Sequence, residues 1–192
     1  MKIGVLALQG DFSEHILMLS KLGAETAEIR LPAQLDGLDG LIIPGGESTT
    51  IGKLMVDFGL FEPIRDFGLA RPIWGTCAGA ILLSKDAQRE QPLLGLMDIT
   101  VERNAFGRQV DSFEADLNIE AFGEGNPFHA VFIRAPIIEA VQGDAKVLVT
   151  LADGRIVAAQ DGHLLATSFH PELTGDMRFH VYFLSLVKRE MR

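Results

Sequence analysis

The chain has 192 residues, of which 47% are hydrophobic and 22% charged, so it is not an intrinsically disordered protein and we expect one domain over residues 1–192. Its formal net charge of −9 argues against non-specific binding to nucleic acid or to anionic membranes, and leaves small molecules and other proteins as ligands. The single cysteine cannot form an internal disulfide, and no apolar run reaches the roughly 20 residues of a membrane span. The apolar stretch at the start is too short for a secretory signal. We therefore expect a cytoplasmic location.

The first half of the chain alternates apolar strand patterns with helical ones. Residues 3–8 form an uninterrupted apolar run, which is typical of a parallel strand buried on both faces, and an amphipathic helix follows it. Further strands are predicted over residues 24–31 and 38–43, and helices over residues 51–58 and 60–69. This strand–helix–strand opening predicts an α/β fold with a parallel sheet and helices on both faces.

A Gly-Gly pair follows the third predicted strand, within the sequence Pro-Gly-Gly-Glu-Ser-Thr-Thr of residues 44–50. Ligands of open α/β sheets bind at the carboxyl ends of the strands, where such glycines can present backbone N–H groups to a substrate oxygen. An ordinary tight turn followed by a Ser or Thr helix cap explains the same residues. The Gly-Lys-Ser/Thr ending of a phosphate-binding P-loop is absent, so that kind of nucleotide site is not predicted.

The stretch over residues 72–83 contains the only cysteine of the chain. An apolar run leads into Gly-Thr-Cys-Ala-Gly at residues 75–79, and a helical run predicted to about Lys85 leads out. The Gly-x-Cys-x-Gly spacing matches a nucleophile elbow, a sharp strand-to-helix turn whose glycines allow close backbone approach. At a helix N-terminus, Cys77 is favoured as a thiolate and N–H groups are available for an oxyanion. A buried structural cysteine beside glycines that only pack is the alternative at this point.

The second half of the chain is richer in short strands, predicted over residues 98–103, 112–121, 130–133, 145–151, 155–160 and 164–169. The turn signals Asp153-Gly154 and Asp161-Gly162 separate the last three strands, which indicates antiparallel neighbours. A closing helix is predicted over residues 177–189. We therefore expect a three-layer α/β sandwich with a mixed, mainly parallel central sheet and helices on both faces.

The last predicted strand ends in His170-Pro171-Glu172. A histidine at this strand end is a candidate base for Cys77, and the carboxylate two residues later is placed to orient its ring. A surface turn with a partly exposed histidine is the alternative. The other four histidines are expected to be structural or exposed rather than catalytic: His15, His129, His163 and His180.

Three polar features thus fall at strand ends on one edge of one predicted sheet: the Gly-Gly loop, the elbow cysteine and the late His-x-Glu. Together they supply an oxyanion donor, a nucleophile and a base. The chemistry that this set supports is acyl transfer through a thioester.

The elbow and the late His-x-Glu resemble those of the class I (triad) glutamine amidotransferases. More specific segments resemble one branch of that family, the glutaminase subunits of pyridoxal 5′-phosphate synthases. These segments are Gly-Gly-Glu-Ser-Thr at residues 45–49, Val-Glu-Arg-Asn at 101–104, Phe-Gly-Arg-Gln at 106–109, Ser-Phe-Glu at 112–114, Phe-Ile-Arg-Ala-Pro at 132–136 and Ser-Phe-His-Pro-Glu-Leu at 168–173. The resemblance extends from the first strand to the last helix and implies the class I amidotransferase fold.

The resemblance implies roles for individual residues. Cys77, His170 and Glu172 correspond to the catalytic triad, and backbone N–H groups of Gly46 and Ala78 to the oxyanion hole. The glutamine site implied by the family comprises Gly46, Glu47, Ser48, Arg103, Ile133 and Arg134. An arginine fork suits the substrate carboxylate, and Glu47 suits its ammonium group. From the residues alone, Arg103 and Arg134 could equally form surface salt bridges, and nothing favours them over Arg108. No cofactor and no metal are implied.

The family also implies a partner that consumes the ammonia. In this family the partner is the synthase subunit, which makes pyridoxal 5′-phosphate from a pentose phosphate, a triose phosphate and ammonia. Twelve glutaminases are expected on a dodecameric synthase core, and docking is expected to activate the glutaminase. The Gly45–Gly46 loop is a candidate switch because a glycine peptide can flip at little steric cost.

Three other hypotheses remain open on the sequence. A class I glutaminase that serves another synthase, for example in histidine or anthranilate synthesis, shares the triad but not the segment around Arg103. An elbow-cysteine protein of the peptidase or chaperone type lacks the late His-x-Glu. A non-catalytic binding module predicts that Cys77 is dispensable for any reaction.

Overall fold

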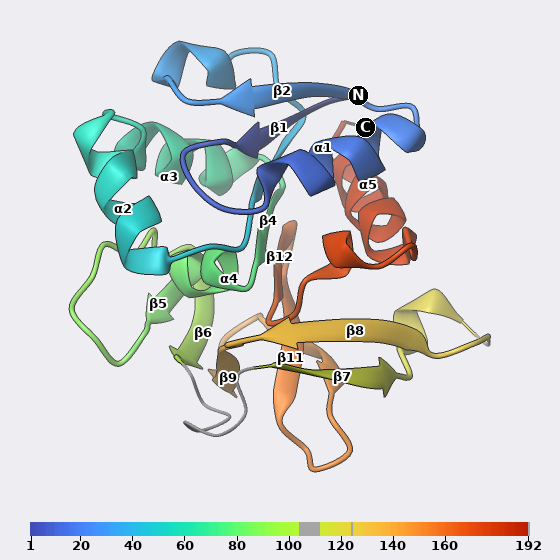
Figure 1. Ribbon diagram of the computed structural model, residues 1–192. Coiled ribbons are helices and arrows are strands. Elements are labelled where there is room, and N and C mark those ends of the chain that lie inside the picture. Colours follow the sequence, from blue (N-terminus) through green and yellow to red (C-terminus); the bar gives the residue numbers. More distant parts are fainter. Residues whose placement is uncertain (104–111, 124, 192) are drawn as a thin grey trace.

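The computed structural model describes residues 1–103, 112–123 and 125–191, and a large twisted sheet lies at their centre (Figure 1). In spatial order its strands are β2 (Glu25–Ile29), β1 (Lys2–Leu6), β3 (Gly40–Ile43), β4 (Ile73–Thr76), β12 (Leu164–Thr167), β11 (Ile156–Asp161), β9 (Ile137–Val141), β6 (Met97–Glu102) and β5 (Ser84–Asp86), and β10 (Lys146–Thr150) pairs with β11. A separate antiparallel hairpin consists of β7 (Ser112–Leu117) and β8 (Phe128–Ile133).

The sheet is mixed, as predicted. Strands β2, β1, β3, β4 and β12 form a run in which each neighbouring pair is parallel, and β5 and β6 are parallel to each other. The pairs β12–β11, β11–β10, β11–β9 and β9–β6 are antiparallel. The predicted turns after residues 153 and 161 join β10 to β11 and β11 to β12, so those hairpins are confirmed.

Helices cover both faces of the sheet. They are α1 (Phe12–Lys21), α2 (Ser48–Asp57), α3 (Phe61–Ala70), α4 (Ala78–Leu83) and α5 (Arg178–Glu190), with single 3₁₀ turns at Pro32–Leu35, Glu120–Phe122 and Pro171–Leu173. One core packs the sheet against α2, α3 and α4, and the other packs it against α1, α5 and the β7–β8 hairpin (Figure 1). None of the described helices is long and apolar enough to cross a membrane.

The continuous apolar runs of the first half are explained by these two cores. In β3, Leu41 and Ile43 point into the core under α2–α4, while Ile42 points into the core under α1 and α5. All three side chains are fully buried. A strand covered on both faces shows no polar alternation, which is why it appears in the sequence as an apolar block.

Three element predictions were wrong in detail. The elbow helix ends at Leu83 instead of near Lys85, because Ser84 bonds back to the Ile81 carbonyl at 2.7 Å and the chain continues as β5 beside β6. The strand predicted over residues 112–121 ends at Leu117. Strand β9 was not predicted, although it joins the two halves of the sheet between β11 and β6.

Candidate active site

The elbow cysteine has the strained backbone that a nucleophile elbow requires. Cys77 joins β4 to α4 with φ 48° and ψ −102°, a positive φ that non-glycine residues rarely adopt. Its N–H donates to the Thr167 carbonyl of β12 at 2.8 Å, which holds the turn against the neighbouring strand. A Cβ built on Gly79 would lie 2.0 Å from the Ile43 carbonyl oxygen, so α4 starts where only glycine fits.

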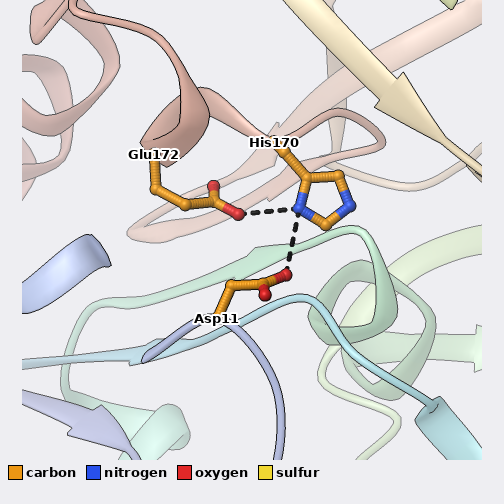
Figure 2. A group of neighbouring side chains, drawn as sticks. All are labelled: Asp11, His170 and Glu172. Carbon is orange, nitrogen blue, oxygen red and sulfur yellow. Dashed lines mark hydrogen bonds and ion pairs between the residues drawn. The ribbon is translucent and has the colours of Figure 1, made fainter. Parts of the chain in front are cut away.

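The histidine and the carboxylate of the predicted triad are in direct contact. Nδ1 of His170 lies 2.7 Å from Oε1 of Glu172, and both side chains are buried (Figure 2). Pro171 starts the 3₁₀ turn that carries Glu172 back beneath the imidazole. Burial raises the pKa of Glu172, and its hydrogen bond with His170 partly offsets that effect.

His170 also interacts with the elbow cysteine. Burial acts to lower the pKa of His170, but hydrogen bonding to Cys77 and Glu172 outweighs it and raises the pKa to about 10. Nδ1 faces Glu172 and Nε2 lies on the other side of the ring (Figure 2), so Nε2 is the nitrogen left to interact with Cys77. The ring is thus placed between Cys77 and a carboxylate, and its raised pKa means that it takes the thiol proton readily and holds it near pH 7, oriented by a third group.

A second carboxylate approaches the same imidazole. Asp11 occupies the N-cap position of α1, yet its side chain makes no capping bond. Instead its Oδ2 lies 3.5 Å from Nδ1 of His170, the same nitrogen that faces Glu172 (Figure 2). No sequence signal indicates this contact, because an aspartate before a helix ordinarily predicts only a cap.

A cavity of about 450 Å³ lies in front of the elbow at the carboxyl edge of the sheet. This volume suits a small-molecule substrate. Every predicted site residue except Glu172 lines it, and Glu172 is buried behind His170. The lining residues are Gln9, Asp11, Gly46, Glu47, Ser48, Cys77, Ala78, Ile81, Arg103, Ile133, Arg134, His170 and Leu173.

Two of the predicted substrate partners bind each other in this structure. Nη2 of Arg103 lies 2.8 Å from Oε1 of Glu47, at the rim of the cavity. Glu47 also caps α2 by accepting from the N–H groups of Thr49 and Thr50. Burial acts to raise the pKa of Glu47, but the bonds from Thr50, Arg103 and Thr49 outweigh it and lower the pKa to about 2. Glu47 is therefore an anion that is already shared between a helix end and an arginine.

The remaining predicted residues lie around the elbow. Sγ of Cys77 is 4.0 Å from the Ile133 carbonyl oxygen, and Arg134 follows with a positive φ of 42°. Gly46 has φ 153°, and a Cβ there would lie 2.6 Å from Oε1 of Gln9. These positions bring the Gly-Gly loop to Cys77, as the strand-end argument predicted, and the end of β8 beside it, as the resemblance implies.

Gln91 is a residue of this region that the sequence did not single out. Its Oε1 accepts from Ser48 Oγ at 3.2 Å and from Nη1 of Arg103 at 3.2 Å. Its Nε2 is buried with no hydrogen-bond partner among the described residues. The sequence pattern predicts only a polar loop at Gln91, and only the structure shows that it contacts two residues that line the cavity.

One group of possible metal ligands lies within the described part of the chain: Asp11, His170 and Glu172, whose ligand atoms all lie within 4.8 Å of one another (Figure 2). A metal on Nδ1 of His170 would replace the hydrogen bond to Glu172. The contacts therefore suit an oriented base better than a cation, and the expectation of no metal and no cofactor stays a prediction.

Part of the predicted motif set lies outside the described residues. This part is the stretch of residues 104–109, which includes Arg108, the alternative that the sequence could not separate from Arg103. Arg103 itself is described and lines the cavity.

Comparisons with known proteins identify related sequences and structures. The model of the SNO glutamine amidotransferase family matches residues 5–189. The chain is 61% identical to the pyridoxal 5′-phosphate synthase subunit PdxT of Herpetosiphon aurantiacus, over 97% of this chain and 100% of that protein. It is 59% identical to the protein of the same name from Moorella thermoacetica, with the same coverage of both chains. A crystal structure of a glutamine amidotransferase superposes with a TM-score of 0.91 at 50% identity, covering 97% of this chain and 98% of that one. The structure of PurLQS from Thermotoga maritima shares the fold, with a TM-score of 0.67 at 16% identity over 98% of this chain and 96% of that one.

Proposed function

Because this chain belongs to the SNO glutamine amidotransferase family, we propose that its cavity hydrolyses L-glutamine through a thioester on Cys77. The chain is a glutaminase, and it supplies ammonia to pyridoxal 5′-phosphate synthase. The observation that carries the proposed roles is the strained elbow cysteine sharing one cavity with an imidazole that is bound to a buried carboxylate.

The proposed reaction starts with attack of Sγ of Cys77 on the side-chain amide carbon of glutamine. His170 takes the thiol proton and delivers it to the leaving ammonia, while Glu172 orients the imidazole and stabilises its charged form. Backbone N–H groups of Ala78 and Gly46 hold the tetrahedral oxyanion, each worth about 3 kcal/mol of barrier. Water then hydrolyses the glutamyl thioester to glutamate.

We assign the charged rim of the cavity to the ends of the amino acid. Arg103, Arg134 and Glu47 line the cavity, which supports binding of the α-carboxylate by the two arginines and of the α-ammonium group by Glu47. Glutamine would then exchange the internal Arg103–Glu47 pair for two pairs with the substrate. Ser48 and Ile133 complete the wall of the site.

Partnership with the synthase subunit follows from the family, and the assembly of twelve glutaminases on a dodecameric core stays a proposal. The Gly45–Gly46 loop is the proposed switch. A Cβ on Gly45 would lie 2.4 Å from Cε1 of His170, so the loop rests directly on the base. The cytoplasmic location stays a prediction from the single cysteine.

The proposed function is tested by reconstitution. The chain is mixed with a pentose phosphate, a triose phosphate and the subunit that carries the synthase activity, and formation of pyridoxal 5′-phosphate is followed by absorbance. Glutamine should support the reaction only when this chain is present. High glutamine hydrolysis by the isolated chain, unchanged by the synthase, would contradict the coupling between the two.

The substrate assignment of Arg103 leads to a mutational prediction. We expect Arg103→Ala to raise the KM for glutamine by about 10- to 100-fold with a smaller change in kcat, because a hydrogen bond between charged groups contributes about 1.5–3 kcal/mol. Arg103→Lys should restore part of the loss, since it keeps the charge but not the fork. Arg65→Ala, on exposed α3, is the matched control. A KM unchanged in Arg103→Ala would remove this arginine from the site.

A further inference from the structure

Two buried histidines lie directly behind the proposed triad, on the side away from the cavity. His15 is on α1 and His180 on α5, and neither side chain is exposed. They were expected to be structural or exposed. Their burial agrees with a structural role, and His15 in addition reaches the proposed catalytic carboxylate, because its Nε2 lies 3.3 Å from Oε2 of Glu172.

The contacts of this pair assign its tautomers. Nδ1 of His15 lies 3.0 Å from Nε2 of His180, so one of these two nitrogens must carry a hydrogen. Burial lowers the pKa of His180 to about 4, and burial together with the His180 and His170 charges lowers the pKa of His15, so both rings are neutral near pH 7. A neutral imidazole has one donor and one acceptor nitrogen.

The proton between the two rings belongs to His180. Nδ1 of His180 is buried with no hydrogen-bond partner among the described residues, and a buried bare acceptor is tolerated better than a buried orphan N–H. His180 therefore donates from Nε2 to Nδ1 of His15. His15 must then carry its hydrogen on Nε2, where Thr76 Oγ1 at 3.2 Å and Oε2 of Glu172 at 3.3 Å are its neighbours.

We propose that His15 is a positioning residue for glutamine hydrolysis, whose Nε2–H holds the second oxygen of Glu172 while His180 keeps His15 in the donating tautomer. The inference rests on the proposed roles of Cys77, His170 and Glu172. Oε1 of Glu172 is held by His170, but Oε2 has no hydrogen bond of ordinary geometry with any described residue. Nε2 of His15, at 3.3 Å, is thus a side-chain donor beside an otherwise unpartnered oxygen.

A carboxylate held at one oxygen can rotate about its last bond, whereas a donor at each oxygen fixes its plane. The second donor also favours the ionised carboxylate at a site where burial raises its pKa. An ionised Glu172 is what stabilises the imidazolium that forms when His170 takes the proton of Cys77. His15 therefore acts on the base through Glu172, without touching substrate.

The groups that face His15 come from four elements. His180 approaches from α5, Glu172 from the 3₁₀ turn after β12, and Thr76 from the end of β4. His170 adds the charge that acts on His15 from the strand end. The ring of Trp74, 5.5 Å from His15 between centroids, closes the site with an apolar edge.

The test compares two variants in which an amide side chain replaces His15, each in the complex with the synthase subunit. The amide nitrogen of His15→Gln takes the place of Nε2 and keeps a donor for Glu172, whereas His15→Asn reaches only as far as Nδ1 and keeps the contact with His180. We expect His15→Asn to lower kcat for glutamine by about 10- to 100-fold and to leave KM unchanged. Losses of this size are found when a residue that hydrogen-bonds to an active-site group, without touching substrate, is removed. The acid limb of the kcat profile should move to higher pH, because Glu172 then ionises less readily. His15→Gln should restore most of kcat and the original profile.

Two further variants, both on α5, test the proposal if His15→Asn does not fold. His180→Phe removes the donor behind His15 and should shift the pH profile in the same direction by a smaller amount. Phe183→Leu is the control, because Phe183 lies in the same core and on the same helix, 5.7 Å from Trp74 between ring centroids. It should lower the melting temperature without moving the pH profile of kcat.

Equal kcat values and equal pH profiles for His15→Asn and His15→Gln would overturn the role of His15, provided that Cys77→Ala is inactive in the same assay. An active Cys77→Ala would overturn the proposed function itself.

Discussion

Cys77→Ala is expected to lower glutamine hydrolysis by the complex by about 10⁴-fold or more, the scale of loss seen when a catalytic nucleophile is removed. The chain has no other cysteine, so no second thiol can form the thioester. The fold should survive, since the side chain becomes smaller at a position that is 6% exposed beside the cavity. The measurement is ammonia release from glutamine in the presence of the synthase.

Two controls separate the loss of the nucleophile from the loss of the complex. With an ammonium salt in place of glutamine, the Cys77→Ala complex should still form pyridoxal 5′-phosphate at the wild-type rate, because the synthase no longer needs the glutaminase. A glutamine-like chloroketone should label the wild-type chain and not the variant. Hydrolysis by Cys77→Ala close to the wild-type rate would support the non-catalytic binding module instead.

The second large effect is expected at the glycine that closes the elbow. In Gly79→Ala the new Cβ would lie 2.0 Å from the carbonyl oxygen and 2.9 Å from the carbonyl carbon of Ile43, both backbone atoms of a fully buried strand. Neither atom can yield as the end of a flexible side chain would, so α4 must move away from β3. We expect the free energy of unfolding to fall by about 3 kcal/mol or more, at the upper end of overpacking costs.

Gly79→Ala should also lower kcat, because the displaced helix carries the N–H of Ala78 and the turn that aims Cys77. Denaturant unfolding and ammonia release measure the two effects. Gly175→Ala is the matched control: its Cβ would have no atom within 4 Å, so its stability should change by less than about 0.5 kcal/mol. Similar unfolding midpoints for the two variants would show that the elbow tolerates a side chain at residue 79.

Much of the site followed from the strand pattern, for a geometric reason. Neighbouring parallel strands end at the same edge, so the residues after β3, β4 and β12 were expected to converge, and the cavity lies there. Strand β9 was missed because it follows Pro136 closely and its five residues show little alternation. Strand β5 was missed because its three residues continue a helical pattern and are a strand only by pairing with β6.

The supporting contacts of the site could not be predicted in the same way. Periodicity placed His15 and His180 on helices, but their rings meet across 165 residues of sequence. Arg103 and Glu47 meet across 56 residues. Asp11 lies just before α1, where an aspartate ordinarily predicts only a helix cap, and only the tertiary structure brings its side chain to His170.

The sequence by itself determined the elbow and the parallel strands that precede it, and it predicted Cys77, His170 and Glu172 as nucleophile, base and carboxylate. These features depend on short-range sterics and on burial, which local residue types specify. Only the tertiary structure decided what stands behind and beside the triad: His15 and His180 beneath Glu172, Asp11 beside His170, and Arg103 paired with Glu47. Contacts of that kind depend on how helices from distant parts of the chain pack on the sheet, and no local pattern encodes which side chain a buried imidazole will face.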